Sequence, residues 1–351
     1  MSDGDLLAVM RSRGAQFAEV DGRTVAVSFG DAAGEYQALR ERAALVDLAW
    51  LDRLTVTGSD RVDFLQGMLS NDVKKLTVGT GCPALLLSEQ GKTIAAMIVL
   101  ASEDAFALDG VASSLEAARA GLERFIVADD VEIVPAGGAE HTFALLGPDA
   151  PAVVARLGAA VPAAPYDHVR ADMGGAAVHL VRVPTPGVGG FLCRVSTDTA
   201  AAWWERCLDL AGAVPAGNEA FEVLRIESGV PWHGRDVTAD TLALEAPYGA
   251  AISFRKGCYL GQEVMERVTA RGQVNRKLVG LEVAGDVVPV AGVRLRAGEQ
   301  DVGWVTSAAW SWRLGCVVAL AYVRREYLDP GTTLVVGDAP GVPSTVRALP
   351  F

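Results

Sequence analysis

The last quarter of the chain constrains the fold most, because it is a run of short strands with no long helix between them. Apolar segments of four to nine residues alternate with glycine and proline; they are Leu278–Val283, Val293–Arg296, Val302–Ser307, Gly315–Val323 and Thr332–Val336. Short strands at this spacing are typical of a small antiparallel barrel. The sequence therefore predicts a C-terminal β-barrel and a domain boundary near residue 275.

The residues before this boundary mix strands and helices in an irregular order. Arg53–Thr57 alternates as a strand does, and Ser59 or Asp60 can cap a helix after it. Residues 84–88 and 93–100 are apolar and flank Gly91, which predicts a hairpin. Neither a GxGxxG nor a P-loop motif is present, so a nucleotide cradle is not expected. The pattern favours an α+β layer structure, and 351 residues suffice for two or three domains.

The chain is acidic, but one segment reverses the sign. Lys and Arg total 31 against 43 Asp and Glu, a net charge of -12, so direct nucleic-acid binding is not expected. From Arg255 to Lys277, six basic residues stand against two acidic ones, a local net charge of +4. This basic segment has two interpretations: a site that holds an acidic small molecule, or a solvated surface that balances acidic neighbours.

Cysteine and histidine usage gives no sign of a metal centre or a disulfide framework. The five cysteines are far apart, with no CxxC, and the four histidines do not fall at metal-ligand spacing. The apolar run at residues 93–101 is about half of what a bilayer span needs, and the N-terminus lacks the apolar core of a secretory signal. We expect a reduced cytoplasmic protein without a metal or a membrane partner.

One octapeptide, KGCYLGQE at residues 256–263, differs from generic core sequence. Its Cys258 lies between two glycines, after Lys256 and just before a predicted helix, a setting that favours a lowered thiol pKa and nucleophilic reactivity. The alternative is that Cys258, like most isolated cysteines, is a buried apolar residue. Upstream, Arg225 and Glu227 lie on a predicted helix over residues 219–227, either as a structural ion pair or as ligand-binding groups.

The octapeptide resembles the signature Lys-Gly-Cys-Tyr-x-Gly-Gln-Glu of the YgfZ-type folate-binding proteins, relatives of the glycine cleavage T-protein, an aminomethyltransferase. Further segments resemble elements of that family in the same order; they are Leu69–Val73, Arg225–Gly229, Val302–Ser307 and Leu320–Val323. The resemblance implies a three-domain cloverleaf around a central hole that holds tetrahydrofolate or a one-carbon derivative. The expected domains are residues 1–110 with 217–274, which bind folate, then 111–216, and the barrel at 275–351.

The resemblance also implies which residues bind the ligand. A carboxylate can bind the edge of a pterin ring through paired hydrogen bonds, and Glu227 is assigned that task. The anionic glutamate tail of folate is assigned to Arg267 and Arg271 of the basic segment. Aromatic side chains expected to pack on the ring system are Tyr248, Tyr259 or Trp232. The remaining cofactor-binding residues, taken from the matched segments, are Asn71, Arg225 and Gln262.

The chain departs from the T-proteins at a position that matters for chemistry. T-proteins carry a catalytic Asp in the strand after a glycine-containing hairpin, and here Ala95 and Ala96 stand in that stretch. A methyl group cannot manage the proton that aminomethyl transfer requires near the folate nitrogen. We therefore do not expect a glycine cleavage enzyme. Cys258, with Lys256 near it, is assigned as the functional thiol and is expected to stand in place of the missing acid.

The function that this resemblance implies is that of a tetrahydrofolate-binding accessory protein. It would act in the assembly or repair of iron–sulfur clusters in client enzymes, including one that modifies tRNA, with Cys258 as sulfur acceptor, iron ligand or mixed-disulfide partner. The alternative is a folate-dependent aminomethyltransferase or other one-carbon transferase or demethylase, with Asp72 or Glu89 as a substitute acid. A third interpretation is an interaction scaffold with a vestigial pocket.

Overall fold

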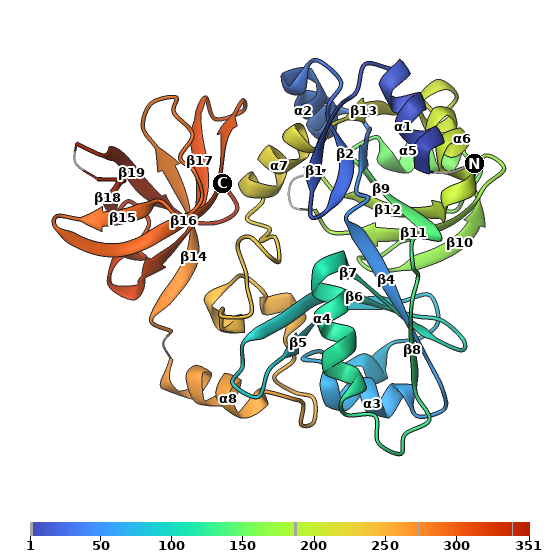
Figure 1. Ribbon diagram of the computed structural model, residues 1–351, viewed down its shortest axis with the longest axis horizontal. Coiled ribbons are helices and arrows are strands. Elements are labelled where there is room, and N and C mark those ends of the chain that lie inside the picture. The colour runs from blue at the N-terminus through green and yellow to red at the C-terminus, as the bar shows by residue number, and fades with distance from the viewer. Residues whose placement is uncertain (1–2, 186–187, 273, 339) are drawn as a thin grey trace.

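A computed structural model shows a barrel on one side of the molecule and two stacked sheets on the other (Figure 1). The structure describes residues 3–185, 188–272, 274–338 and 340–351. The chain between the last helix of the upper sheet and the barrel runs between these parts (Figure 1). No helix in the described ranges is long and apolar enough to cross a membrane.

The upper sheet has six strands in the order β10-β11-β12-β9-β3-β13. Its strands are β3 (Ala44–Asp47), β9 (Glu140–Leu146), β10 (His168–Asp172), β11 (Ala177–Val183), β12 (Gly190–Ser196) and β13 (Val214–Ala216). Only β13, which pairs with β3, runs parallel to its neighbour. Leu45 and Leu145 belong to one hydrophobic cluster and Val46 and Leu146 to another, so both faces of this sheet are buried.

Helices cover both of these faces. The helices on one face are α1 (Asp3–Ser12), α5 (Ala150–Arg156) and α6 (Thr197–Asp209), and those on the other are α2 (Ala32–Glu41) and α7 (Asn218–Glu227). Trp203 and Trp204 of α6 are completely buried in the first of the two clusters. A separate hairpin, β1 (Gln16–Val20) and β2 (Arg23–Ser28), lies beside α7.

The lower sheet has five strands in the order β5-β6-β7-β4-β8. Its strands are β4 (Leu51–Thr57), β5 (Gly81–Leu87), β6 (Thr93–Ala101), β7 (Phe106–Val111) and β8 (Glu132–Pro135), and its helices are α3 (Arg61–Met68) and α4 (Ala112–Glu123). The predicted hairpin is present as β5 and β6. Gly91 in its turn has φ +72°, a conformation that favours glycine, and an added Cβ would lie in tight contact, 3.0 Å from Val264.

The barrel is closed, in the order β14-β17-β16-β15-β18-β19. Its strands are β14 (Arg276–Val283), β15 (Arg294–Ala297), β16 (Gln300–Ser311), β17 (Cys316–Arg324), β18 (Thr333–Val336) and β19 (Val342–Arg347). Inward side chains such as Leu281, Val305 and Leu334 fill its interior. The predicted α+β class and the C-terminal antiparallel barrel are thereby confirmed.

The remaining elements are short or lie in connections. They are α8 (Gln262–Arg271) and the 3₁₀ turns Val73–Lys75, Ala243–Glu245, Gly249–Ala251 and Arg325–Tyr327. The two sheets are assembled across the predicted domain boundaries, since β3 joins the strands of residues 140–216 and β8 joins those of residues 51–111. The domain boundaries themselves stay a prediction.

Candidate functional site: a central cavity

A cavity of about 500 Å³ lies where the two sheets meet the chain between α7 and the barrel. Its walls come from β6 and β7, from the end of α7 and the loop after it, and from Leu349 and Pro350 at the C-terminus. Most of the lining is apolar, with a few polar groups among it, which is the usual make-up of a site for an organic ligand.

Aromatic side chains form one wall of the cavity. The rings of Trp50 and Trp232 lie 3.9 Å apart between centroids, and Phe221 lies 6.3 Å from Trp50. The buried hydroxyl of Tyr248 and the buried Nε1 of Trp50 have no hydrogen-bond partner among the described residues. Burial raises the pKa of Tyr248, so its hydroxyl stays a donor. Because both polar atoms are buried, the wall offers a ligand the faces of its rings and not these donors.

Strand β6 presents Ala96 to the cavity. Side chains alternate along this strand, and Ala95 is buried in the core under α3 and α4 while Ala96 lines the cavity. The stretch in which an acid was expected therefore contributes a single methyl group to the site. Asp109 on β7 is the one carboxylate among the described lining residues.

Asp109 belongs to a buried charge network behind the cavity wall. Arg53 donates two hydrogen bonds to it, at 2.7 and 2.8 Å, and Arg194 approaches to 3.3 Å. Although burial alone would raise the pKa of Asp109, the two guanidinium groups hold it well below its usual range. Arg53 also donates to Nδ1 of His179, whose Nε2 is 2.9 Å from Nδ1 of His168. Such a carboxylate is not basic and cannot serve as the missing proton acceptor.

Arg225 lines the cavity, but its guanidinium is fully bonded. It donates to Glu222 at 2.8 and 2.5 Å, to Asp236 at 2.7 Å, to Ser307 at 2.9 Å and to the backbone oxygen of Val230 at 2.5 Å. The side chain is 4% exposed. The structural ion-pair interpretation of Arg225 therefore holds, although the partners are Glu222 and Asp236 and not Glu227.

Glu227 is not among the residues that line the central cavity. Its carboxylate accepts hydrogen bonds from Tyr36 at 2.6 Å, Ser311 at 2.5 Å and Arg313 at 3.2 Å. Burial and, as the second cause, the hydrogen bond to this carboxylate raise the pKa of Tyr36 to about 12. Glu227 thus joins α2 and the barrel to α7. The two positions that separate it from Arg225 turn it away from the cavity.

Asn71 supports the cavity wall from behind. Its side-chain amide donates to the backbone oxygens of Pro83 and Ala250, at 2.7 and 3.1 Å, and both of those residues line the cavity. Lys256 holds the same turn. Its ammonium donates to the backbone oxygens of Gln66, Leu69 and Asn71, which uses all three of its protons. Burial lowers the pKa of Lys256 to about 8.

Cys258 is exposed, so the interpretation of this cysteine as a buried apolar residue is wrong. The thiol is not among the residues that line the central cavity. It therefore does not take the position of the missing acid, which corrects the expected placement. The reason is local: Gly257 and Cys258 form a surface loop between buried Lys256 and buried Tyr259.

The other predicted ligand residues lie on or beside α8, away from the cavity. Tyr259 is buried against Leu85 and Met265. Gln262 accepts from the backbone N–H of Tyr259 at 3.2 Å and donates to Glu266 at 2.7 Å. Arg267 is exposed, and the side chain of Arg271 lies outside the described part. The basic segment therefore does not line the cavity, and of the predicted set only Arg225, Tyr248 and Trp232 do.

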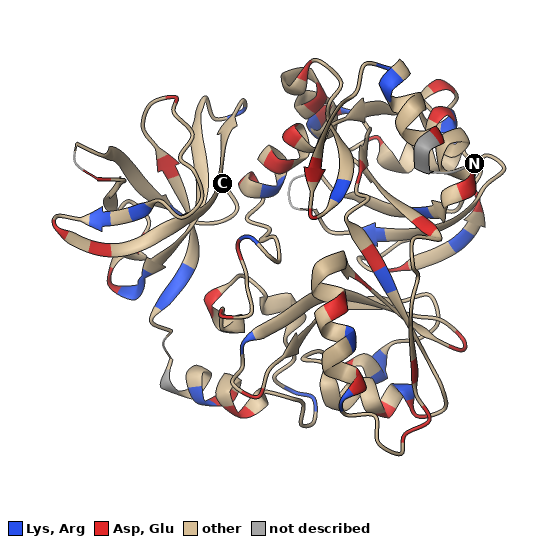
Figure 2. Ribbon diagram, viewed as in Figure 1, with Lys and Arg blue, Asp and Glu red and all other residues tan. Residues whose placement is uncertain are grey.

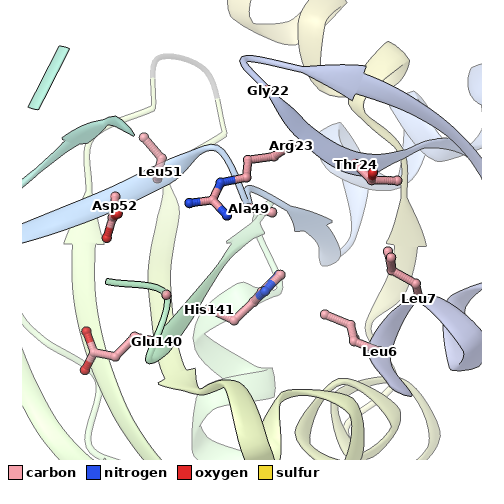
Figure 3. Close-up of a pocket in the computed structure, with 11 residues that line it drawn as sticks. Leu6, Leu7, Gly22, Arg23, Thr24, Ala49, Leu51, Asp52, Glu140 and His141 are labelled. Atoms are coloured by element: carbon pink, nitrogen blue, oxygen red, sulfur yellow. The ribbon is translucent and has the colours of Figure 1, made fainter. Parts of the chain in front are cut away.

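A second pocket, of about 270 Å³, lies between α1, the turn of the first hairpin and the start of β9 (Figure 3). Arg23, Asp52, Glu140 and His141 are drawn around it (Figure 3). His141 Nε2 is 2.8 Å from Asp47, and the ring packs on Phe143 with centroids 4.6 Å apart. The contact with Asp47 joins β9 to β3, which gives His141 a structural role.

Comparison with known proteins identifies the family. Residues 6–256 match the GCVT N-terminal domain, and residues 276–351 match the glycine cleavage T-protein C-terminal barrel domain. The chain belongs to the glycine cleavage T-protein family. The T-protein fold of this chain also agrees with the crystal structure of the glycine cleavage system aminomethyltransferase T from Bartonella henselae. That structure has a TM-score of 0.90 at 24% identity, covering 99% of this chain and 96% of the other.

Curated relatives of this T-protein family member carry the name aminomethyltransferase. The relative from Rubrobacter xylanophilus is 30% identical over 97% of this chain and 91% of its own length. The relative from Halalkalibacterium halodurans is 28% identical over 92% of this chain and 90% of its own length. The resemblance to the T-protein family is thereby confirmed, whereas these matches do not identify the YgfZ type within it.

Two parts of the site could not be assigned from the sequence. Trp50 follows a buried strand and carries no motif, so nothing indicated its place in the wall. The sequence does indicate that Asp109 is unusual, because it is a charged residue inside the otherwise apolar strand Phe106–Val111. A buried charge of this kind requires partners. The partners, Arg53 and Arg194, are 56 and 85 residues away, however, and no local spacing reveals them.

Proposed function

We propose that this T-protein family member binds a reduced folate, tetrahydrofolate or a one-carbon derivative, in the central cavity. Membership of the family supports the ligand class. The single observation that carries the proposal for this site is the aromatic wall of Trp50, Trp232 and Phe221, on which a flat ring system can stack. The cavity volume of about 500 Å³ and its apolar lining fit a flat ring system.

Titration with tetrahydrofolate is expected to quench tryptophan fluorescence, because Trp50 and Trp232 lie in the cavity wall. Ala96→Leu should weaken this binding roughly tenfold to a hundredfold, since overpacking a filled site costs about 1–3 kcal/mol. Ala120→Leu, on the exposed face of α4, is the matched control and should bind as the unchanged protein does. Absence of quenching in the unchanged protein would contradict the proposal.

We further propose that the bound folate is not used for aminomethyl transfer in the manner of a glycine cleavage enzyme. Ala96 supplies no acid, and Asp109 is held by Arg53 and Arg194. The alternative, an aminomethyltransferase, is favoured by the names of the curated relatives. A direct assay separates the two: methylene-tetrahydrofolate formed above background from an aminomethyl-loaded carrier protein supports the alternative.

For the role beyond folate binding, we propose an accessory function for iron–sulfur enzymes with Cys258 as the working thiol. The octapeptide at residues 256–263 and the exposure of this thiol support the proposal. Cys258→Ser should abolish rescue of iron–sulfur enzyme activity in a deletion strain. Because the thiol lies outside the cavity, the same variant should keep its tetrahydrofolate affinity. Cys316→Ser is the control, and full rescue by Cys258→Ser would overturn the role of the thiol.

A further inference from the structure

A groove of about 640 Å³ lies at one end of the barrel, where β14 begins and β17 ends. Basic side chains from three strands and the turn after β17 line it; they are Arg276, Arg294, Arg324 and Arg325. Trp304 and Tyr327 supply aromatic surface between them. Figure 2 shows basic segments at the start of β14 and along the barrel strands, in a chain whose net charge is -12.

The register of the barrel strands brings two of the arginines together, while β16 lies between Arg324 and Arg294. Arg276 on β14 lies directly opposite Arg324 on β17, and Arg294 on β15 lies opposite Trp304 on β16. Like charges directly opposite on adjacent strands repel and destabilise the pair. An anion bound between the guanidinium groups would turn this repulsion into attraction.

Acidic residues in and beside the groove neutralise part of this charge, at Arg325 and Arg276. Glu326 accepts from Arg325 at 3.0 Å, and Asp301 lies 3.5 Å from Arg296. Arg276 contacts Glu245 at 3.1 Å, and its guanidinium stacks 4.8 Å above the ring of Trp304, which fixes its position. Arg294 and Arg324 are exposed and form no ion pair or side-chain hydrogen bond with any described residue.

We propose that this groove binds a ligand that carries two or more phosphate groups. The planar fork of arginine matches phosphate oxygens in paired hydrogen bonds. The directly opposed pair Arg276 and Arg324 favours a compact multivalent anion over an acidic peptide, whose carboxylates are spaced along a chain. The groove shares no residue with the central cavity, so this inference goes beyond the proposed folate function.

Calorimetric titration at low salt with inorganic pyrophosphate and with ADP tests the proposal. Both ligands should bind, and raised salt should weaken the binding. The double variant Arg294→Gln/Arg324→Gln should weaken it at least about tenfold, because charge-assisted hydrogen bonds are lost. Arg170→Gln removes an exposed arginine from β10 and is the matched control, with no expected effect.

Titration of the same variants with tetrahydrofolate measures binding in the central cavity, which shares no residue with the groove. Unchanged affinity for tetrahydrofolate shows that the variants are folded. No binding of either phosphate ligand, or equal binding by the double variant and the unchanged protein, would overturn the proposal. A hexaglutamate peptide that binds more tightly than pyrophosphate would also overturn it, since the groove would then prefer spaced carboxylates. Tighter binding of ADP than of pyrophosphate supports it and adds a contact to the base or ribose.

Discussion

Replacing Arg225 with methionine is expected to lower the free energy of unfolding by about 3–5 kcal/mol. The guanidinium is buried and bonds two carboxylates, those of Glu222 and Asp236. Asp236 is 1% exposed, so removal of its positive partner leaves a buried charge that only neutral donors compensate. Urea denaturation of Arg225→Met and of the unchanged protein measures the difference.

The variant Arg235→Ala provides the matched comparison. Arg235 also approaches Glu222, at 3.7 Å, and lies 4.4 Å above the ring of Trp232, but its side chain is 41% exposed. Exposed ion pairs and cation–π contacts are each worth up to about 1 kcal/mol, so a loss near that size is expected. Equal losses for Arg225→Met and Arg235→Ala would show that burial does not give Arg225 its importance.

Arg225 also explains how the barrel is joined to the rest of the molecule. Asp236 accepts hydrogen bonds from Thr306 at 2.5 Å and Ser307 at 2.7 Å, both on β16. The same carboxylate accepts from the backbone N–H of Trp232, whose ring lines the cavity. One buried ion pair therefore connects α7, the cavity wall and the barrel. We expect Arg225→Met to weaken folate binding through this wall as well as to lower stability.

The strands of the barrel could be predicted from the sequence because their determinants are local. Glycine and proline punctuate this part of the chain, and β16 pairs with β17, the next strand. The hairpin around Gly91 could be predicted for the same reason. The closure of the barrel is not local, because β14 pairs with β17 and β19. The two sheets were harder, since β3 and β9 pair although about a hundred residues separate them, and no local pattern specifies that pairing.

Some of the residues that line the cavity were predicted from the sequence and others were not. Tyr248 and Trp232 were named as aromatic side chains that could pack on a ring system, and both line the cavity. Glu227 was expected to bind the ligand because its segment matches a family element, but its carboxylate binds Ser311 of the barrel, 84 residues away, a contact that no local pattern predicts. For Ala95 and Ala96, strand alternation alone shows that only one of the two can face a cavity, but not which one.

Acid is expected to destabilise the protein through His179, well above the pH at which carboxylates titrate. Burial, followed by the charge of Arg53, lowers the pKa of His179 from 6.5 to about 2. Its Nδ1 accepts from Arg53 at 2.9 Å, so the ring must be neutral in the folded state. The unfolded chain takes up a proton near pH 6.5 and the folded chain does not, so stability is full above that pH and falls below it.

Between pH 6.5 and 4.5 this difference should remove about 2–3 kcal/mol of unfolding free energy, at 1.36 kcal/mol per pKa unit. The variant His179→Gln keeps an acceptor for Arg53 but has no side chain that titrates at this position. Over the same pH range its unfolding free energy should therefore fall by about 2–3 kcal/mol less than that of the unchanged protein. Asp109 does not interfere: its lowered pKa gives stability that is present above about pH 4 and is lost only below it. The measurement is the unfolding free energy of both proteins as a function of pH. If the two curves run parallel, the ring of His179 is protonated in the folded state, and the hydrogen bond that it accepts from Arg53 cannot exist.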